Sequence, residues 1–293
     1  MRPDWLKSVN AEQPVLIAGP TASGKSALAL EIAADQGGVI VNADALQVFS
    51  NWHVLTARPS RDEESVAPHL LYGHVPGDSS YSVGHWLRDL APVLQGDARA
   101  IIVGGTGLYL TALTKGLAEI PPTPPQIREQ ADARRLAEGH DGMLSELDSH
   151  TTARIDVLNP MRVQRAWEVW QTTGRGLAAW QDDTPAPMLA LQDAQPLLID
   201  ADRDWLWQRI ARRFDRMIAD GALEEARRNL AGWNPAFASS KAIGAPELID
   251  HLQGNRDLKD AVEAGKIATR QYAKRQRTWF RSKMAAWRSL PLP

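Results

Sequence analysis

The chain has 293 residues, of which 44% are hydrophobic and 23% are charged, the composition of an ordinary globular protein. Its length suits one large domain, or a core domain with an insertion. It contains no cysteine, so disulfides, cysteine–zinc sites and thiol nucleophiles are excluded. The sequence shows neither an apolar run long enough to span a membrane nor a signal-peptide pattern, so we expect a cytoplasmic protein.

Short apolar runs in the chain alternate with helical patterns. Residues 14–18, 38–42, 100–103 and 196–200 have the pattern of buried strands, and a helix is expected from Ser26, directly after a glycine-rich turn. Fully apolar strands that alternate with helices are typical of a parallel sheet covered on both faces. The sequence therefore predicts an α/β fold.

Two proline-rich stretches, at residues 121–125 and 184–187, bracket a segment with a helical pattern. From Trp205 to Trp287 the pattern is helical again, with breaks near residues 232–235 and at Gly254. We therefore expect a catalytic core over residues 1–120 and a helical insertion domain over 121–190. Residues 191–293 are expected to return to the core and to end in basic helices.

The turn after the first strand reads Gly19-Pro20-Thr21-Ala22-Ser23-Gly24-Lys25-Ser26 and matches the phosphate-loop pattern G-x-x-x-x-G-K-[ST] at every fixed position. A strand before it and a helix after it complete the expected context. Backbone N–H groups and the helix N-terminus would bind phosphate oxygens there. Lys25 would add a mobile positive charge, and the Ser26 hydroxyl would hold Mg²⁺. The motif predicts a polyphosphate site.

Two further strand ends bear on which polyphosphate is bound. The strand 100–103 leads into Gly104-Gly105-Thr106, which has a hydroxyl where a P-loop kinase usually carries a carboxylate for Mg²⁺. A diphosphate that leaves as a unit suits these groups better than γ-phosphoryl transfer. Asp44 follows the second strand, where it either faces the ligand crevice or caps a following helix.

The charges of the chain are distributed unevenly. After Glu263 there is no acidic residue, whereas eight basic residues follow, so the body of the chain is acidic and its end is basic. Arg270, Lys274, Arg277 and Arg281 are spaced for one face of a helix. A solvated helix would normally mix in acidic residues for i,i+4 pairs, so this pattern favours contact with nucleic acid.

Together these motifs resemble those of bacterial tRNA dimethylallyltransferases. The resemblance covers, in order, the phosphate loop and the segments Asn42–Phe49, Thr56–Pro59, Val103–Tyr109, Asn159–Ala166 and Thr269–Arg281. It implies a P-loop NTPase-like parallel sheet flanked by helices, with a helical insertion domain and a helical C-terminal region. The implied reaction moves a dimethylallyl group from its diphosphate to N6 of the adenosine 3′-adjacent to the anticodon of tRNA, with Mg²⁺.

The resemblance also assigns roles to residues. Gly19, Pro20, Thr21, Ala22, Ser23, Gly24, Lys25 and Ser26 would hold dimethylallyl diphosphate. Asp44 would be the general base, Thr106 would orient N6, and Gln47 would contact the adenine edge. The expected tRNA contacts are Asp44, Ala45, Leu46, Gln47, Thr106, Arg128, Met161, Arg162, Val163, Gln164, Arg165, Lys241, Ala242, Ile243, Gly244, Ala245, Pro246, Lys274, Arg275, Gln276, Arg277, Thr278, Trp279, Phe280 and Arg281.

The chain also departs from the family pattern. Leu55 and Arg58 stand where the family usually has Gly and Lys, Met161 replaces a Gln, and Ala245 follows Gly244 where a Tyr is usual. We expect the anticodon stem-loop of tRNA as partner and a monomeric protein. The alternatives are a P-loop small-molecule kinase and an isopentenyltransferase that acts on free adenylate.

Overall fold

The computed structural model describes residues 4–292, which form two compact units. Within the described residues, the first comprises 4–114 and 188–292, and the second is Lys115–Pro187. None of the helices that the structure describes is long and apolar enough to cross a membrane.

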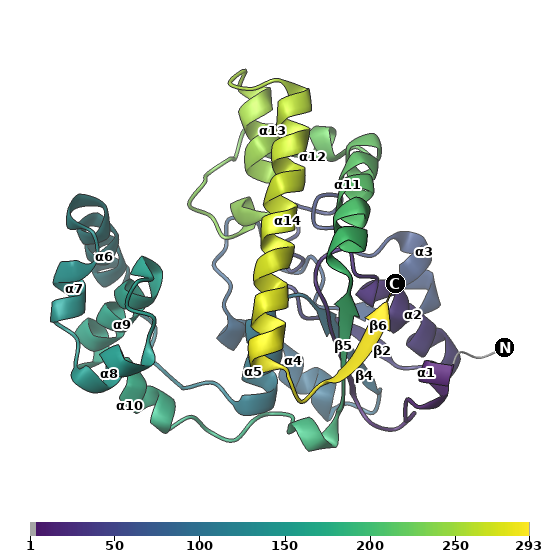
Figure 1. Cartoon of the computed structure of the whole chain (residues 1–293), viewed down its shortest axis with the longest axis horizontal. Helices are drawn as coiled ribbons and strands as arrows, with labels where there is room; N and C mark the ends of the chain where they lie inside the picture. The colour runs from purple at the N-terminus through teal and green to yellow at the C-terminus, as the bar shows by residue number, and fades with distance from the viewer. Residues whose placement is uncertain (1–3, 293) are drawn as a thin grey trace. The chain divides into compact units, whose positions relative to one another are not determined.

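The first unit is built on a parallel sheet with the strand order β3-β2-β4-β1-β5-β6 (Figure 1). Its strands are β1 (Val15–Ala18), β2 (Val39–Asn42), β3 (His69–Leu70), β4 (Ala100–Gly104), β5 (Gln195–Ala201) and β6 (Arg288–Leu292). Every pair of neighbouring strands is parallel. The predicted α/β fold is thus confirmed.

Two strands lie outside the four expected ones. β3 is a two-residue strand that pairs with β2, and β6 pairs with the outer edge of β5. The first is too short to give a periodic pattern, and the second depends on a pairing partner about 90 residues earlier in the chain. Residues 288–292 follow Trp287, where the expected helical pattern ends, and form a strand that the sequence pattern did not indicate.

Helices cover both faces of the sheet, and alternate strand residues point to opposite faces. Val15 and Ile17 pack with Ile32 of α2, whereas Leu16 packs with Trp86 of α4. The helices of this unit are α1 (Asp4–Lys7), α2 (Lys25–Gln36), α3 (Arg61–Val66), α4 (Val83–Gln95), α5 (Gly107–Lys115), α11 (Arg203–Ala219), α12 (Ala222–Asn229), α13 (Ala245–Leu252) and α14 (Leu258–Lys283). Two single turns of 3₁₀ helix, at Leu191–Asp193 and Ser239–Lys241, complete it.

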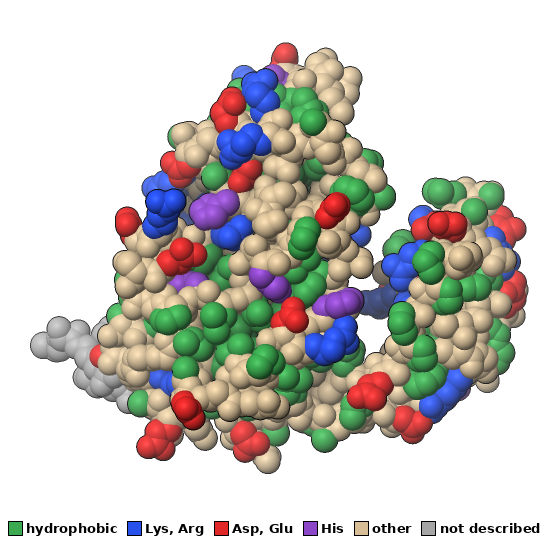
Figure 2. Space-filling model, turned by 180° about the vertical axis from the view of Figure 1, so that it is seen from behind, with side chains coloured by type: hydrophobic (Ala, Val, Ile, Leu, Met, Phe, Trp, Pro, Cys, Tyr) green, Lys and Arg blue, Asp and Glu red, His purple; other side chains and the backbone are tan. Residues whose placement is uncertain are grey.

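The second unit is entirely helical. It contains α6 (Pro125–Glu138), α7 (Asp141–Ser145), α8 (Ser149–Arg154), α9 (Pro160–Thr173) and α10 (Leu177–Asp182). Ala131, Met143, Val163 and Trp167 form its core. Its surface carries hydrophobic side chains among basic and acidic ones (Figure 2), and Leu136, Leu158 and Met161 are exposed.

Candidate active site

Three loops meet at the carboxyl-terminal edge of the sheet. Because β4 lies between β1 and β2, the phosphate loop after β1, Thr106 after β4 and Asp44 after β2 come from neighbouring strands. The Thr106 hydroxyl accepts a hydrogen bond from the Ala45 N–H at 2.9 Å, which fixes the second and third loops to each other. This is the edge at which open α/β sheets bind ligands.

Asp44 is held in a defined orientation. One of its carboxylate oxygens, Oδ1, accepts the Leu46 N–H at 3.0 Å, and its own N–H donates to the Asn42 side chain at 2.8 Å. Residues 45–60, all of them described, contain no helix. The alternative that Asp44 caps a following helix is therefore wrong, and its second carboxylate oxygen is free to act at the site.

The predicted phosphate loop has a backbone conformation suited to binding an anion. Ala22 and Gly24 have φ angles of 63° and 92°, in the left-handed region, and α2 begins directly afterwards at Lys25. The first N–H groups of α2 therefore have no acceptor within the helix. These N–H groups and the positive end of the helix dipole face the space in front of the loop, where an anion can bind.

Gln276 ties the phosphate loop to the loop after β4. It is 5% exposed, and its amide oxygen accepts the Thr21 N–H at 2.8 Å while its amide nitrogen donates to the Gly105 carbonyl at 2.9 Å. Both ends of this side chain are thus engaged inside the protein. In this structure the Gln276 side chain braces the two loops, and its expected contact with tRNA stays a prediction.

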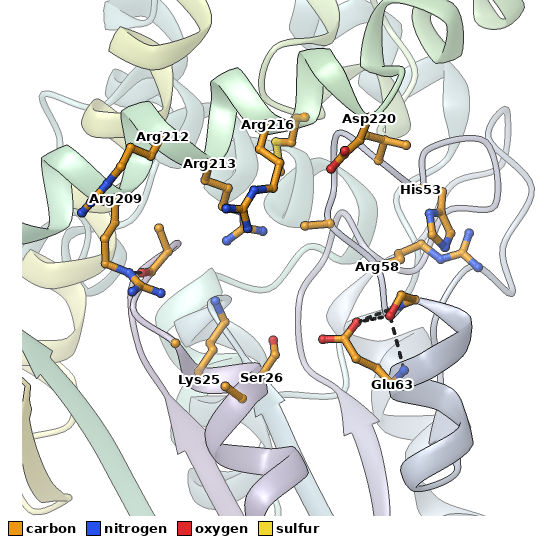
Figure 3. A pocket seen from close by; sticks show the side chains of 17 residues that line it. Lys25, Ser26, His53, Arg58, Glu63, Arg209, Arg212, Arg213, Arg216 and Asp220 are labelled. Carbon is orange, nitrogen blue, oxygen red and sulfur yellow. Dashed lines mark hydrogen bonds between the residues drawn. The ribbon is translucent and has the colours of Figure 1, made fainter.

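A large cavity of about 960 Å³ opens in front of the phosphate loop (Figure 3). Lys25 and Ser26 lie on one side of it, and Glu63 of α3 lies on the wall across from Ser26. The opposite wall is formed by a row of arginines on α11, namely Arg209, Arg212, Arg213 and Arg216. Such a set of cations around exposed N–H groups suits a polyphosphate.

These arginines were not among the residues expected from the sequence. Their spacing of three, one and three residues places them on one side of a helix, which is the signal that would have found them. Arg209 also donates to the Ala22 carbonyl at 3.0 Å, so α11 is joined directly to the phosphate loop. Burial lowers the pKa of Arg213 from its ordinary value, while Asp44 opposes that shift.

A small pocket of about 60 Å³ adjoins the large cavity and contains Asp44. Ala22, Arg213 and Met217 border both spaces. The remaining side chains of the small pocket are of two kinds. Five are apolar, Leu46, Leu55, Ile210, Phe214 and Ile243, and four carry hydroxyl groups, Thr21, Thr56, Thr269 and Tyr272. Burial raises the pKa of the Tyr272 phenol above its ordinary value, with the Asp44 charge adding to the shift, so this hydroxyl stays protonated.

Several residues expected to contact tRNA are held inside the protein. Both hydrogens of the Gln47 amide donate to backbone carbonyls, of Thr56 and Ala57, at 2.9 Å each, so they are not available to an adenine. The expected contact of Gln47 with the adenine edge stays a prediction, for which this conformation offers the amide oxygen and not its hydrogens. Five other residues offer no side-chain surface to an RNA because they are buried: Val163, Gln164, Ala242, Ala245 and Phe280.

Other expected contacts do lie at the surface. On α14 four residues are exposed, namely Lys274, Arg275, Thr278 and Arg281, and two are half-buried, Arg277 and Trp279. In the segment before and at the start of α13, Lys241 and Pro246 are exposed, Ile243 is half-buried and Gly244 is buried. In the second unit Met161, Arg128 and Arg162 are exposed, and the guanidinium groups of Arg128 and Arg165 lie 3.7 and 3.6 Å from the buried Glu168 carboxylate. Lys266 is an exception among the basic residues of α14, because it pairs with Asp215 at 2.7 Å.

The electrostatics of Lys25 give a pH prediction. Although this side chain keeps some exposed surface, burial lowers its pKa to about 8 in the free protein. Below pH 8 the ammonium is present and attracts a diphosphate. Above pH 8 binding must be accompanied by proton uptake, so we expect the affinity for inorganic diphosphate to fall by up to about tenfold per pH unit.

Protein stability is expected to change in the opposite direction. Between pH 8 and pH 10.5 the unfolded chain still binds a proton at Lys25 that the folded chain has lost, so the free energy of unfolding rises with pH. Calorimetric titration with diphosphate from pH 6.5 to 9.5 measures the affinity. Lys25→Arg, which stays charged, should remove the decline in affinity above pH 8. The same decline in affinity in both proteins would contradict the assignment of this pH dependence to Lys25.

Comparison with known proteins gives a consistent result. A model of the family "IPP transferase" matches residues 47–283, and one described as "Isopentenyl transferase" matches residues 13–67. A tRNA dimethylallyltransferase of Roseobacter denitrificans is 63% identical over 94% of this chain and 98% of its own length. One from Cereibacter sphaeroides is 59% identical over 98% of this chain and 92% of its own length.

Solved structures agree with these sequence relatives. The tRNA isopentenylpyrophosphate transferase of Bacillus halodurans superposes with a TM-score of 0.67 at 30% identity, over 96% of this chain and 90% of that chain. A eukaryotic dimethylallyltransferase acting on tRNA superposes with a TM-score of 0.80 at 22% identity, over 96% of this chain and 74% of that one, and it supports the fold alone.

Proposed function

This chain belongs to the IPP transferase family of tRNA dimethylallyltransferases, and from that premise we propose how its own residues perform the reaction. The protein is an enzyme that transfers a dimethylallyl group to an adenosine of tRNA. What the proposal adds is the place of each substrate in the site and the role of each side chain. We also propose that the enzyme acts as a monomer in the cytoplasm, where tRNA is found.

The donor, dimethylallyl diphosphate, spans the two adjoining spaces. Its diphosphate lies in the large cavity, against the N-terminus of α2, Lys25 and the arginines of α11. Its five-carbon group lies in the small pocket, against the apolar side chains there and next to Asp44. The observation that carries this placement is that Ala22, Arg213 and Met217 border both spaces, because the bond that breaks joins a highly charged group to an apolar one.

Charge develops on both sides of that bond as it breaks. The C1–O bond of the donor opens, the electron pair stays on the diphosphate, and C1 bonds to N6 of adenosine. Lys25, Arg213 and the N–H groups of α2 stabilise the negative charge of the departing diphosphate. The amine becomes strongly acidic as it acquires its new bond, and the free oxygen of Asp44 accepts its proton. Thr106, whose hydroxyl accepts a hydrogen bond from the Ala45 N–H in the loop of Asp44, orients N6.

The residues around Ser26 are compatible with Mg²⁺. No group of three or more histidine, aspartate or glutamate side chains that could hold a metal occurs among the described residues, so an all-protein metal cage is absent from that part of the chain. Mg²⁺ typically keeps several waters and is held by substrate phosphates with one or two protein oxygens. The exposed Ser26 hydroxyl and the Glu63 carboxylate across from it would supply these oxygens. When bound, the ion would neutralise charge on the diphosphate.

The acceptor tRNA would bring its splayed adenosine to Asp44, since sequence-specific readers act on unstacked bases. We propose that its anticodon stem-loop contacts the exposed basic residues of α14 and, in the second unit, Arg128, Arg162 and Arg165. All of these are cations at the surface, and the α14 set lies on the unit that holds the catalytic residues.

Replacing Arg277 and Arg281 together by Gln tests this contact with tRNA. We expect weaker tRNA binding and a salt dependence of the binding constant that is shallower by about 1.5, since each lost phosphate contact removes roughly 0.7–0.9 from the slope. Filter binding at four or more salt concentrations measures it. Arg256→Gln, which replaces a cation ion-paired with Asp250 at 3.3 Å, is the control. An unchanged slope in the double variant would remove α14 from the interface.

One assay tests the assigned reaction against the alternatives. Purified protein with Mg²⁺ and radiolabelled dimethylallyl diphosphate is incubated with unmodified tRNA or with AMP. We expect label on tRNA alone. Label on AMP would favour a free-nucleotide enzyme, and ATP turnover without label on either acceptor would favour a kinase.

A further inference from the structure

Leu55 forms the wall between the small pocket and the hydrophobic core behind it. Its side chain is 5% exposed and lines the pocket that contains Asp44. The same side chain belongs to an apolar cluster with Trp52, Ala245 and Leu248, none of which lines the pocket. Leu55 therefore separates the pocket from this cluster.

The backbone at Leu55 is fixed by a buried carboxylate. Glu225 of α12 is 3% exposed and accepts hydrogen bonds from three consecutive N–H groups, those of His53, Val54 and Leu55, at 2.6, 3.0 and 2.9 Å. A buried carboxylate is costly to leave unpaired, so the loop and Glu225 hold each other in place. On the other side, the Gln47 amide holds the carbonyls of the next two residues. The loop cannot withdraw from the pocket without breaking these bonds.

The side chain of Leu55 has little room to move away. A Cβ atom added at Gly244 would lie 3.1 Å from Leu55 Cδ2 and 2.9 Å from the Phe214 ring, so both side chains pack directly onto this glycine. Leu55 and Ala245 lie in the same apolar cluster. The larger side chain at 55 is thus accommodated next to a small one at 245.

We propose that Leu55 limits the transferred group to five carbons. This inference rests on the proposed placement of the dimethylallyl group in the small pocket. A geranyl group is five carbons longer and would have to extend past the wall that Leu55 forms. Leu55→Ala removes three carbon atoms from that wall and Leu55→Gly removes four. Because Glu225 holds the backbone, the space so created stays open next to the pocket instead of closing by loop movement.

The test compares two donors on one acceptor. Dimethylallyl and geranyl diphosphate are each given with unmodified tRNA to the unaltered enzyme and to the Leu55→Ala and Leu55→Gly variants, and kcat/KM is measured for both. We expect the ratio of geranyl to dimethylallyl transfer to rise at least about tenfold in the variants, the lower end of what a methylene-sized change in an apolar pocket usually produces. Leu248→Ala is the matched control, because it removes side-chain volume from the same cluster at a residue that does not line the pocket.

The outcomes separate this inference from the proposed function. An unaltered enzyme that transfers no dimethylallyl group would overturn the function itself. Variants that transfer dimethylallyl but reject geranyl, or a ratio that rises equally in Leu248→Ala, would overturn the role of Leu55 alone. Leu55→Phe supplies a test in the opposite direction: we expect KM for dimethylallyl diphosphate to rise while KM for tRNA is unchanged, and an unchanged donor KM would contradict the inference.

Discussion

Asp44→Asn is expected to lower kcat by about 10²–10⁴, the usual contribution of a positioned general base. Asparagine has nearly the same shape and keeps an oxygen that can accept the Leu46 N–H, so the loop should retain its conformation. The amide cannot take up the proton that N6 releases as its bond to C1 forms. The chemical step should therefore slow while both substrates still bind. Single-turnover transfer to tRNA measures this effect without product release.

Binding of inorganic diphosphate with Mg²⁺ is the accompanying measurement for Asp44→Asn. We expect the dissociation constant to stay within about threefold of that of the unaltered enzyme, because the large cavity is lined by other groups. Asp97→Asn is the control. Asp97 is an exposed acidic residue that precedes β4, at the end of that strand away from the site. Loss of diphosphate binding in Asp44→Asn would instead make Asp44 part of the Mg²⁺ site.

The features that could be predicted from the sequence are those encoded locally. Four strands and the phosphate loop were recognised because each is a short apolar run or a glycine-rich turn that sets its own conformation. The rule that ligands bind at the carboxyl ends of parallel strands gave one of the two alternatives for Asp44, whereas the role of Thr106 came from the family resemblance. Strand β6 was missed because it is defined by pairing with β5 rather than by any pattern of its own.

The roles along α14 show where the motif was misleading. Ala273, Gln276 and Phe280 recur at helical spacing and form its buried face, whereas Lys274 and Arg281 lie on the exposed one. The family motif covers both faces, so carrying it over whole assigned buried residues to tRNA. Applying the helical period within the motif would have separated them. Glu225 could not have been found in this way, because its partners lie about 170 residues earlier in the chain.

Arg213 was not among the site residues expected from the sequence, yet the structure places it at both spaces of the site. Its replacement should have the second large effect on the rate. Arg213 borders both the large cavity and the small pocket, so in the proposed placement of the donor it lies next to the bond that breaks. Most of its surface is buried, where a positive charge acts on the developing diphosphate with little screening by water. Arg213→Gln should therefore lower kcat/KM by about 10²–10³, the cost of removing one preorganised group that stabilises transition-state charge.

The adjacent arginine is the matched control. Arg212 is exposed and lines only the large cavity, so Arg212→Gln should change kcat/KM by less than about fivefold. Arg213→Lys keeps the charge but loses the planar fork of donors, and we expect it to recover only part of the rate. Steady-state kinetics with varied donor at saturating tRNA distinguishes the cases. A rise in KM with unchanged kcat in Arg213→Gln would mean that Arg213 binds ground state and transition state equally. Equal losses in the two Gln variants would mean that the whole arginine row acts as a diffuse field rather than one group placed at the leaving oxygen.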